Sequence, residues 1–330
     1  MASDKGGSLG HRPIALSCGE PAGIGPELAF KAWQALKQDC PFFWIGDPSH
    51  LPADCPVALI DSPDQAIGAT GLPVLPHPMP GPLTPGTPNP AHAEGVISAI
   101  ARAVELVQSG AASALCTAPI HKKALADGAG FSYPGHTEFL AALTHTPRVV
   151  MMLASDQLRV VPATIHIPLA DVPAALTQDA LHNTIRITHA GLIRDFGLTN
   201  PRIAIAGLNP HAGEGGKMGD EEISLITPVI RDLRAQGLDL RGPFPADTMF
   251  HAAARAGYDA AICMYHDQAL IPIKTLDFDR GVNVTLGMPI VRTSPDHGTA
   301  LDIAGRGLAN PTSLIEALKM AARMAAGRHA

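Results

Sequence analysis

The sequence predicts an α/β fold with a largely parallel or mixed sheet. Short runs rich in β-branched and aromatic residues alternate along the chain with stretches whose apolar residues recur at helical spacing. The chain has 330 residues, of which 46% are hydrophobic and 16% charged, so it can bury a large core. Its length predicts about two domains, and its composition is that of a globular protein rather than a disordered one.

The alternation begins close to the start of the chain. Strands are expected at residues 13–17 and in the run PFFWIGD, with a helix at 26–37 between them. Proline suits the first position of this helix, and a glutamate in its first turn suits the helix dipole. Residues 71–90 carry eight prolines, which lack a backbone donor. This stretch is therefore expected to be a rigid extended loop and neither a helix nor a central strand.

Strand and helix patterns continue to the end of the chain. Residues 91–108 predict a helix, because Val96, Ile100, Val104 and Val107 recur on one face. Further strands are expected in the runs SALCTAPI, RVVMMLAS, RVVPATIHIPL, RIAIAGLNPH and DAAICMYH. Helical patterns near them cover residues 181–196, 223–236, 248–256 and 313–326.

Composition excludes several classes of partner. The net charge is −6 without any basic run, and aromatic residues make up only 4%, which argues against nucleic acid and anionic membranes as partners. No apolar run approaches the roughly 20 residues that span a bilayer. The start, MASDKGGSLGHRP, has no apolar core of a secretory signal. Five scattered cysteines without CxxC spacing predict free thiols in a reducing cytoplasm, and no cysteine cage for zinc.

Residues 19–27, GEPAGIGPE, lie between a predicted strand and a predicted helix, where helix N-termini bind anions. Leu28 occupies the third glycine position of the dinucleotide fingerprint, and the Lys-Ser/Thr pair of a phosphate loop is absent. An ordinary Rossmann motif is therefore not supported. A tight strand-to-helix turn and an anion site both stay open.

Three histidines closely follow apolar runs that predict strands. They are His166, His211 and His266, after VVPATI, IAIAGLNP and AAICMY. If these strands are parallel, all three imidazoles reach one edge of the sheet. Three neutral imidazoles with an open position form a site for zinc, cobalt or manganese. The chain has 15 histidines, most of which need no ligand, so an ordinary surface or core role stays open for each.

A second polar set could bind an anion. His136 and Thr137 follow a turn and open a helical pattern, with Thr137 as its expected cap. Lys274, Asn283 and Arg292 lie in the polar stretch 258–307 and are expected at loop ends, where they suit a phosphate or carboxylate. For any one of these cations a solvated surface role is the alternative. Asp247 and Asp267 are candidates for acid–base work or for orienting a ligand, with helix capping as the alternative.

Eight separated motifs, in order, give the chain a family resemblance. GEPAGIGPE, FSYPGHTEFLA, HIPL, GLNPHAGEGG, GPFPADTMF, YHDQAL, GVNVTLGMP and RTSPDHGTALDIAG resemble 4-hydroxythreonine-4-phosphate dehydrogenases of pyridoxal phosphate biosynthesis. HGTALDIAGRGLANP also resembles the adenine-side cofactor loop of isopropylmalate and isocitrate dehydrogenases. The resemblance implies their two-domain fold, with an active site in the interdomain cleft. The implied domains are residues 1–129 with 276–330 on the cofactor side, and 130–275 for metal, substrate and dimerisation.

The resemblance implies a reaction and its helpers. NAD, with NADP as the alternative, takes hydride from C3 of 4-phosphonooxy-L-threonine, and the β-keto acid loses CO2 to give 3-amino-2-oxopropyl phosphate. One divalent metal (zinc, magnesium or cobalt) serves each active site. Members are homodimers with shared active sites, in which one metal histidine comes from the partner chain. His266 is expected to complete the partner's site, so the stretch 258–307 would serve two active sites.

The resemblance also implies roles for individual residues. The metal histidines fall on His166, His211 and His266. The substrate residues fall on His136, Thr137, Lys274, Asn283 and Arg292, and the cofactor loop supplies His297, Gly298, Thr299 and Asp302. These sets coincide with the two polar groups described above.

A few positions depart from the family pattern. Ala269 replaces a glycine, Lys217 stands where a histidine is common, and Ser17-Cys18-Gly-Glu replaces Thr-x-Gly-Asp. They leave open a related dehydrogenase of another hydroxy acid, such as threonate or erythronate phosphate or an aromatic dihydrodiol carboxylate. A non-catalytic binding protein that kept the fold is the alternative of a different class.

Overall fold

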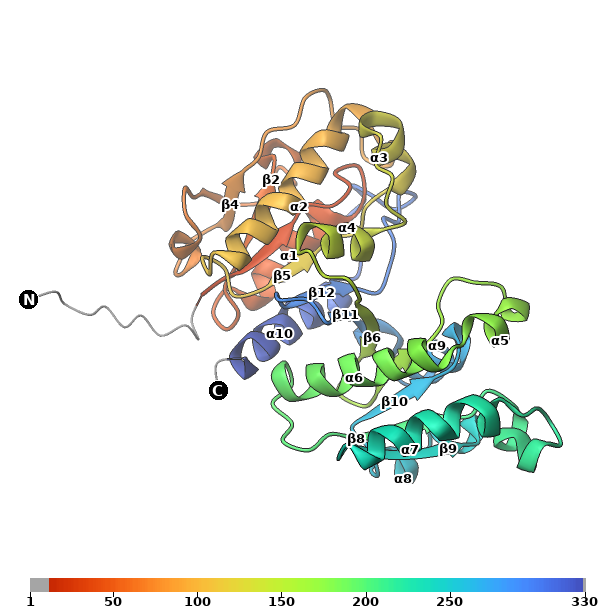
Figure 1. The fold of residues 1–330 in the computed structure, drawn as a ribbon. Coiled ribbons are helices and arrows are strands. Elements are labelled where there is room, and N and C mark those ends of the chain that lie inside the picture. Colours follow the sequence, from red (N-terminus) through yellow and green to blue (C-terminus); the bar gives the residue numbers. More distant parts are fainter. Residues whose placement is uncertain (1–11, 329–330) are drawn as a thin grey trace, which may run out of the picture. The chain divides into compact units, whose positions relative to one another are not determined.

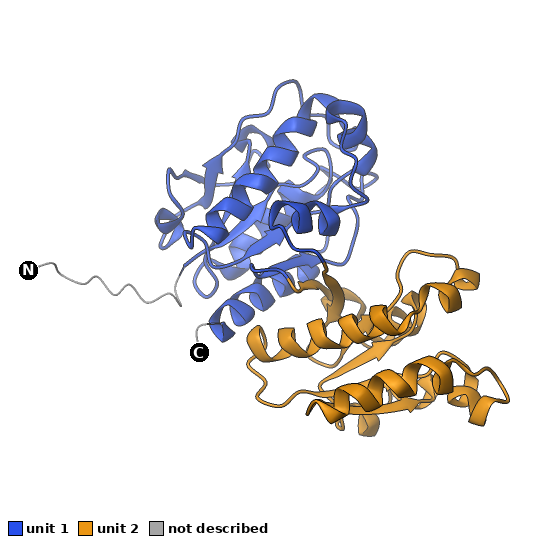
Figure 2. Cartoon of the chain, in the orientation of Figure 1, with its two compact units in different colours: residues 1–147, 288–330 blue, residues 148–287 orange. Residues whose placement is uncertain are grey.

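The structure is a computed structural model that describes residues 12–328, so most of the stretch in which no secretory signal is expected lies outside it. The chain divides into two compact units (Figure 2). Unit 1 is Met1–Pro147 with Met288–Ala330, and unit 2 is Arg148–Gly287. Relative to the expected domains, residues 130–147 and 276–287 fall in the other unit. The functional division into domains stays a prediction.

Unit 1 is a parallel sheet with helices packed on it (Figure 1). Its strand order is β3 (Val57–Leu59), β4 (Leu72–Pro76), β2 (Phe42–Gly46), β1 (Ile14–Ser17), β5 (Leu115–Thr117) and β12 (Arg292–Pro295). Its helices are α1 (Gly25–Leu36), α2 (Ala93–Gln108), α3 (Lys122–Ala129), α4 (His136–Leu143) and α10 (Thr312–Gly327). α2 packs against β1, β2 and β5, while α10 packs against β12 and α1.

The elements predicted at the start of unit 1 are present, and the apolar residues that predicted them are mostly buried. All of β1 and β2 is buried. α1 has proline at its start and Glu27 in its first turn. α2 buries Val96, Ile100 and Val104, which recur at its period, and leaves Val107 half-buried. The expected α/β class is confirmed.

The expectation that residues 71–90 hold no central strand is wrong. β4 lies inside the sheet, between β3 and β2, and is almost entirely buried. Only the rest of the stretch, from residue 77 to the 3-10 turn Pro90–His92, is irregular.

The prolines of β4 stand where the sheet needs no donor from them. The backbone groups of Leu72 and Val74 bond to β3, so Pro73 faces β2 and Pro76 faces β3. The pairing with β2 begins only at Val74, and the pairing with β3 ends there. Each proline therefore lies beyond the ladder that it faces, which is where a strand tolerates one.

Unit 2 is a mixed sheet flanked by helices. Its strand order is β11 (Val282–Leu286), β6 (Val150–Ala154), β7 (Arg159–Pro162), β10 (Ala260–Cys263), β8 (Arg202–Ala206) and β9 (Asp239–Phe244). The pairs of β6 with β11 and β7 are antiparallel, and the pairs from β7 to β9 are parallel. The helices are α5 (Val172–Ala175), α6 (Gln178–Arg194), α7 (Thr227–Ala235), α8 (Ala252–Arg255) and α9 (His266–Asp277).

Two helical predictions in unit 2 need correction, and one helix was missed. The pattern at 223–236 begins as a π-turn, Glu222–Ile226, before α7. The pattern at 248–256 yields only a 3-10 turn and the single turn of α8. α9 was not predicted, because Pro272 in its interior interrupts the helical pattern.

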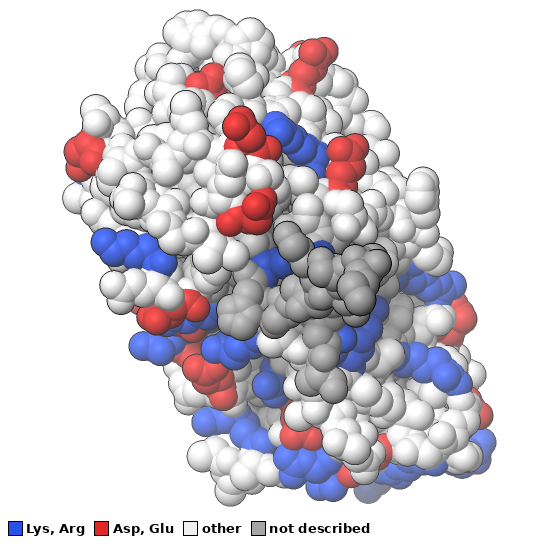
Figure 3. All heavy atoms as spheres, turned by 90° about the vertical axis from the view of Figure 1, so that its left-hand side faces the viewer, with Lys and Arg blue, Asp and Glu red and all other residues white. Residues whose placement is uncertain are grey.

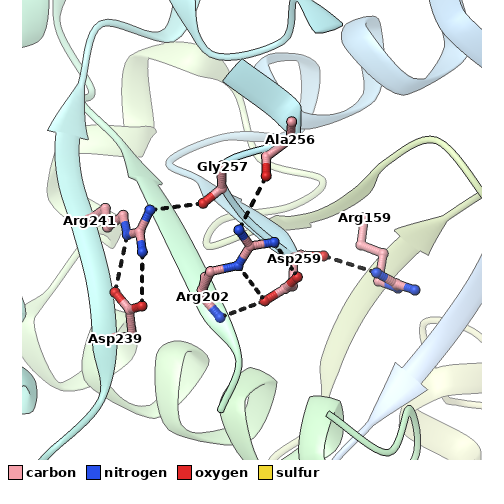
Figure 4. A network of polar contacts seen from close by, with 7 residues as sticks. All are labelled: Arg159, Arg202, Asp239, Arg241, Ala256, Gly257 and Asp259. Carbon is pink, nitrogen blue, oxygen red and sulfur yellow. Dashed lines mark hydrogen bonds and ion pairs between the residues drawn. The ribbon is translucent and has the colours of Figure 1, made fainter. Parts of the chain in front are cut away.

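Hydrogen bonds and ion pairs of charged side chains lie at the amino ends of the parallel strands of unit 2 (Figure 4). Arg202, which begins β8, donates to the Asp259 carboxylate before β10 through its backbone N and Nη2, both at 2.8 Å. Arg159 of β7 donates to the Asp259 carbonyl at 3.1 Å, and Arg241 and Asp239 pair on β9. The Arg202 guanidinium lowers the pKa of Asp259. These pairs are partly exposed, so they align strands more than they add stability.

The surface carries charges of both signs, and the thiols are buried. On the face drawn in Figure 3, acidic side chains lie among the basic ones. Within residues 12–328 no helix has the length and apolar character needed to cross a membrane. All five cysteines are free and buried, and burial raises the pKa of Cys116 to about 12, which keeps that thiol protonated.

Candidate active site

The three candidate metal histidines lie beyond the carboxyl ends of adjacent strands, as predicted. β7, β10 and β8 are neighbours and parallel, so their carboxyl ends share one edge of the sheet (Figure 1). His166 follows β7, His211 follows β8, and His266 opens α9 after β10. This is the edge at which α/β proteins bind ligands. The ion pairs of Figure 4 lie at the opposite ends of these strands.

His166 and His266 face each other within one chain. Their ring centroids are 5.7 Å apart, and both line a cavity of about 240 Å³ together with Tyr265 and Asp267. Asp267 Oδ1 lies 2.7 Å from His266 Nδ1. A carboxylate only accepts, so Nδ1 is the donor in this bond, and Nε2 is the nitrogen left to face a ligand.

These residues fit a divalent cation in their chemistry. A carboxylate that holds one imidazole nitrogen and frees the other is the usual support of a metal-binding histidine. His266 has this support, and both His266 and His166 line one cavity. Among residues 12–328, however, no three His, Cys, Asp or Glu side chains converge on one point, so His211 is not brought to the other two.

The backbone holds two of these histidines in a strained conformation. His166 has φ 51° and His211 has φ 53°, in the left-handed region that non-glycine residues seldom occupy. Residues 211–215 all have left-handed angles, although only two of them are glycines. Such angles cost roughly 1–2 kcal/mol for each L-residue, and strain of this kind concentrates at functional sites.

Unit 1 contains a buried cationic group around the start of α4. Arg292, at the start of β12, is only 3% exposed and donates through Nη2 to Thr117 Oγ1 at 2.8 Å. Burial lowers the pKa of Arg292 to about 10, so its surroundings do not favour the charge. His136 Nε2 is buried without a hydrogen-bond partner among the described residues. A buried orphan beside a buried cation at a helix N-terminus is suited to an anionic ligand.

The charge on His136 itself is disfavoured. Burial, followed by the nearby cations Arg292 and Lys122, holds the pKa of His136 well below its usual value.

The expectation that Thr137 caps α4 is wrong. Gly135 occupies that position, and His136 and Thr137 are the first helical residues, because α4 begins earlier than its polar residues indicate.

The low pKa of His136 predicts a pH dependence of stability. Below pH about 6.5 the histidine takes up a proton in the unfolded chain but stays neutral in the folded one. The free energy of unfolding therefore decreases as the pH is lowered. Between about pH 7.5 and about pH 5.5, the free energy of unfolding should decrease by about 1 kcal/mol less in His136→Gln than in the unsubstituted chain. Urea unfolding of both proteins at the two pH values measures this. An identical loss in the variant would show that His136 is not buried neutral.

Lys274 and Asn283 do not lie at loop ends, contrary to expectation. Lys274 is within α9, half-buried, with Nζ 5.6 Å from the centroid of the Phe278 ring. Asn283 is within β11, and its Oδ1 is buried without a partner among residues 12–328.

Asp247 lies exposed in the 3-10 turn Ala246–Thr248, so nothing in its surroundings favours it as an acid or base.

The candidate cofactor loop is built on the segment 19–27. His297 Nδ1 donates to the Gly298 carbonyl at 2.9 Å, which leaves Nε2 as a buried acceptor without a partner in the described part of the chain. The Ile24 amide donates to the Thr299 carbonyl at 3.0 Å. A Cβ on Gly23 would lie 2.8 Å from that carbonyl oxygen, so only glycine allows this approach. Asp302 is exposed.

Glu27 anchors the far end of the same loop, a role that sequence reasoning missed. Its buried carboxylate accepts from the amides of Ala309 at 2.8 Å and Gly307 at 3.2 Å. The segment 19–27 is therefore a tight turn that supports the loop. A cavity of about 620 Å³, lined partly by Gly23, Lys31 and Gly305, adjoins it.

Polar groups gather at the carboxyl edge of parallel strands, and several buried polar atoms have no partner within residues 12–328. This arrangement is typical of an α/β enzyme that acts on a small molecule. The chain belongs to the family described as pyridoxal phosphate biosynthetic protein PdxA, whose model matches residues 38–321. The resemblance seen in the sequence is thereby confirmed.

Individual relatives agree with this assignment. The chain is 66% identical to 4-hydroxythreonine-4-phosphate dehydrogenase of Ruegeria sp. (strain TM1040), over 96% of this chain and 97% of that one. A crystal structure of the enzyme of that name from Klebsiella pneumoniae has a TM-score of 0.87 at 38% identity, covering 95% of this chain and 98% of that one. A terephthalate 1,2-cis-dihydrodiol dehydrogenase from Burkholderia xenovorans LB400 has a TM-score of 0.67 at 29% identity, covering 94% and 98%. The chain is an oxidoreductase.

Proposed function

We propose that the chain oxidises 4-phosphonooxy-L-threonine at C3 with NAD and decarboxylates the resulting β-keto acid to 3-amino-2-oxopropyl phosphate, in pyridoxine 5'-phosphate biosynthesis. The observation that carries the proposal is the buried guanidinium of Arg292 beside the neutral His136 ring, whose Nε2 lacks a partner among the described residues, because this pair is suited to a phosphate. The names of relatives that match nearly the whole chain support the carbon skeleton. We place the enzyme in the cytoplasm, where its free thiols stay reduced.

The substrate would be held by cationic side chains and by polar atoms that have no partner among residues 12–328, such as His136 Nε2 and Asn283 Oδ1. His136, Thr137 and Arg292 would bind the phosphate, since the first turn of α4 offers free amides beside a buried guanidinium. The orphaned acceptor of Asn283 would take a donor of the substrate, such as its ammonium group. Lys274 would add a second cation.

His166, His211 and His266 would hold a divalent metal, for which zinc, magnesium and cobalt are the candidates. When bound, such a cation acidifies the C3 hydroxyl and stabilises the charge that develops as CO2 leaves. Asp267 orients the His266 ring through Nδ1. Asp247 stays a candidate for proton transfer. We further propose a homodimer in which one of the three histidines comes from the partner chain.

NAD would lie on the loop that holds His297, Gly298, Thr299 and Asp302. The buried Nε2 of His297 is an acceptor suited to the amino group of adenine. The exposed Asp302 carboxylate suits a ribose hydroxyl and would repel a 2'-phosphate, which favours NAD over NADP. The neighbouring cavity of about 620 Å³ is large enough for part of a dinucleotide.

Lys274→Ala should raise KM for the phosphorylated substrate about 10- to 100-fold with a smaller effect on kcat, because it removes a charge that binds substrate and transition state alike. Steady-state formation of NADH measures both constants. Lys319→Ala, which removes a lysine paired with Glu316 at 3.3 Å on α10, is the control. A normal KM in Lys274→Ala would remove this residue from the phosphate site.

A dehydrogenase of another hydroxy acid is the second candidate, favoured by the similarity to the dihydrodiol dehydrogenase. Identity to that enzyme is 29%, against 66% to the Ruegeria relative, so the phosphorylated substrate is preferred. NADH formation should be compared for 4-phosphonooxy-L-threonine, threonate and erythronate phosphates, and an aromatic dihydrodiol carboxylate. Turnover of another substrate without turnover of the first would overturn the proposal.

A further inference from the structure

Hydrogen bonds join the segments that carry His166 and His266. Thr164 is buried, two residues before His166, and its Oγ1 donates to the Met264 carbonyl at 2.7 Å. Met264 lies between β10 and His266 and is itself buried. The two histidine segments are thus fixed to each other by a bond shielded from water.

Gln268 extends this connection to the segment of His211. Its Oε1 accepts from the Met264 amide at 2.6 Å, and its Nε2 donates to the Gly207 carbonyl at 2.8 Å. Gly207 is the first residue after β8, on the way to His211. A side-chain amide is both donor and acceptor, so it can join an N–H of one segment to a C=O of another.

The His211 segment is also held from its other side. The carboxylate of Glu222, 3% exposed, accepts from the Asn209 amide at 2.8 Å and from Asn209 Nδ2 at 3.0 Å. A Cβ on Gly213 would lie 2.5 Å from this carboxylate, and one on Gly207 would lie 2.9 Å from it. Glu222 therefore contacts the segment from Gly207 to the strained turn 211–215, and Gln268 bonds the beginning of this segment at Gly207.

We propose that Gln268 is a positioning residue that fixes the His211 segment relative to the His266 segment. The proposal rests on the proposed function, because it takes the three histidines as metal ligands. The strained turn needs such support, since left-handed residues persist only where their surroundings over-determine them. If His266 serves the partner's site in a dimer, the same bonds connect a ligand of one site to a ligand of the other.

The test uses Gln268→Met, which keeps the length of the side chain and removes both bonds. Gln157→Met is the matched control, because Gln157 Nε2 donates to the Leu276 carbonyl at the far end of the same helix, α9. The full chain, stripped of metal, is titrated with Co²⁺ against a chromophoric chelator. Hydrogen exchange of peptides covering residues 207–216 and 263–268 is measured on the same metal-free samples.

Gln268→Met should lower cobalt affinity about 10- to 100-fold and speed exchange in residues 207–216, with the control unchanged. Unchanged affinity in Gln268→Met would overturn the proposal even if exchange were faster, since the role would then be structural only. If the unsubstituted chain bound no cobalt, the metal assignment would fall. The positioning role, which takes these histidines as metal ligands, would then fall with it, whereas cobalt binding by the unsubstituted chain with unchanged affinity in Gln268→Met overturns the positioning role alone.

A second variant keeps the proposal testable if Gln268→Met does not fold. Gln268→Glu retains an acceptor for the Met264 amide but has no donor for the Gly207 carbonyl. Exchange should therefore rise in residues 207–216 while the Met264 amide stays protected. If Gln268→Glu and the unsubstituted chain showed the same protection from exchange in residues 207–216, the proposal would be overturned.

Discussion

Replacing His166 with alanine should abolish turnover, lowering kcat by about three orders of magnitude or more, while the chain stays folded. A metal site contributes several kcal/mol to the stabilisation of developing charge, and this variant removes one ligand. His166 is exposed and strained, so its loss costs few packing contacts. Steady-state NADH formation gives the rate, and urea unfolding gives the stability.

The chain offers a close control for this variant. His145 is also exposed and also has φ 51°, but it follows the end of α4 and is not one of the candidate site residues. His145→Ala should change neither rate nor folding by much. A near-normal rate in His166→Ala would remove this residue from the metal site.

Arg292→Gln should lower kcat/KM about 100- to 1000-fold. A charge-assisted hydrogen bond contributes about 1.5–3 kcal/mol, and the loss of a buried charge facing a phosphate adds to it. The stability should fall less than this, because a buried charge without its ligand contributes little to folding. Steady-state kinetics and inhibition by inorganic phosphate measure the effect.

Arg102→Gln is the control for Arg292→Gln. Arg102 is also in unit 1 and donates to a backbone carbonyl, that of Pro76, at 3.0 Å. Its loss should leave KM unchanged. Equal KM and equal phosphate inhibition in Arg292→Gln and the unsubstituted chain would contradict an anion site at this residue.

Periodicity predicted the elements whose burial follows a simple rule. β1, α1 and α2 were found because one face, or the whole strand, is apolar. β4 was missed because a strand tolerates proline only where no neighbouring strand needs its N–H. Where the neighbouring strands begin and end is known only from the sheet. α9 was missed because its polar residues and Pro272 hide its buried face.

The candidate site was predicted as a set of residues but not as a geometry. Strand ends placed His166, His211 and His266 at one edge, as the structure has them. The left-handed backbone of His211 was not predicted, although Gly213 and Gly215 beside it were a signal of it. Gln268 and Glu222 were overlooked because their bonds join segments far apart in the chain. The shared dimer site came from the resemblance alone.

The most direct test of the proposed reaction follows both of its steps at once. The purified chain, with NAD and a divalent metal, would be given 4-phosphonooxy-L-threonine labelled with ¹³C at the carboxyl carbon. We predict that NADH and labelled CO2 form in equal amounts and that 3-amino-2-oxopropyl phosphate accumulates. NADH without CO2, or neither product from protein whose metal content has been verified, would contradict the account.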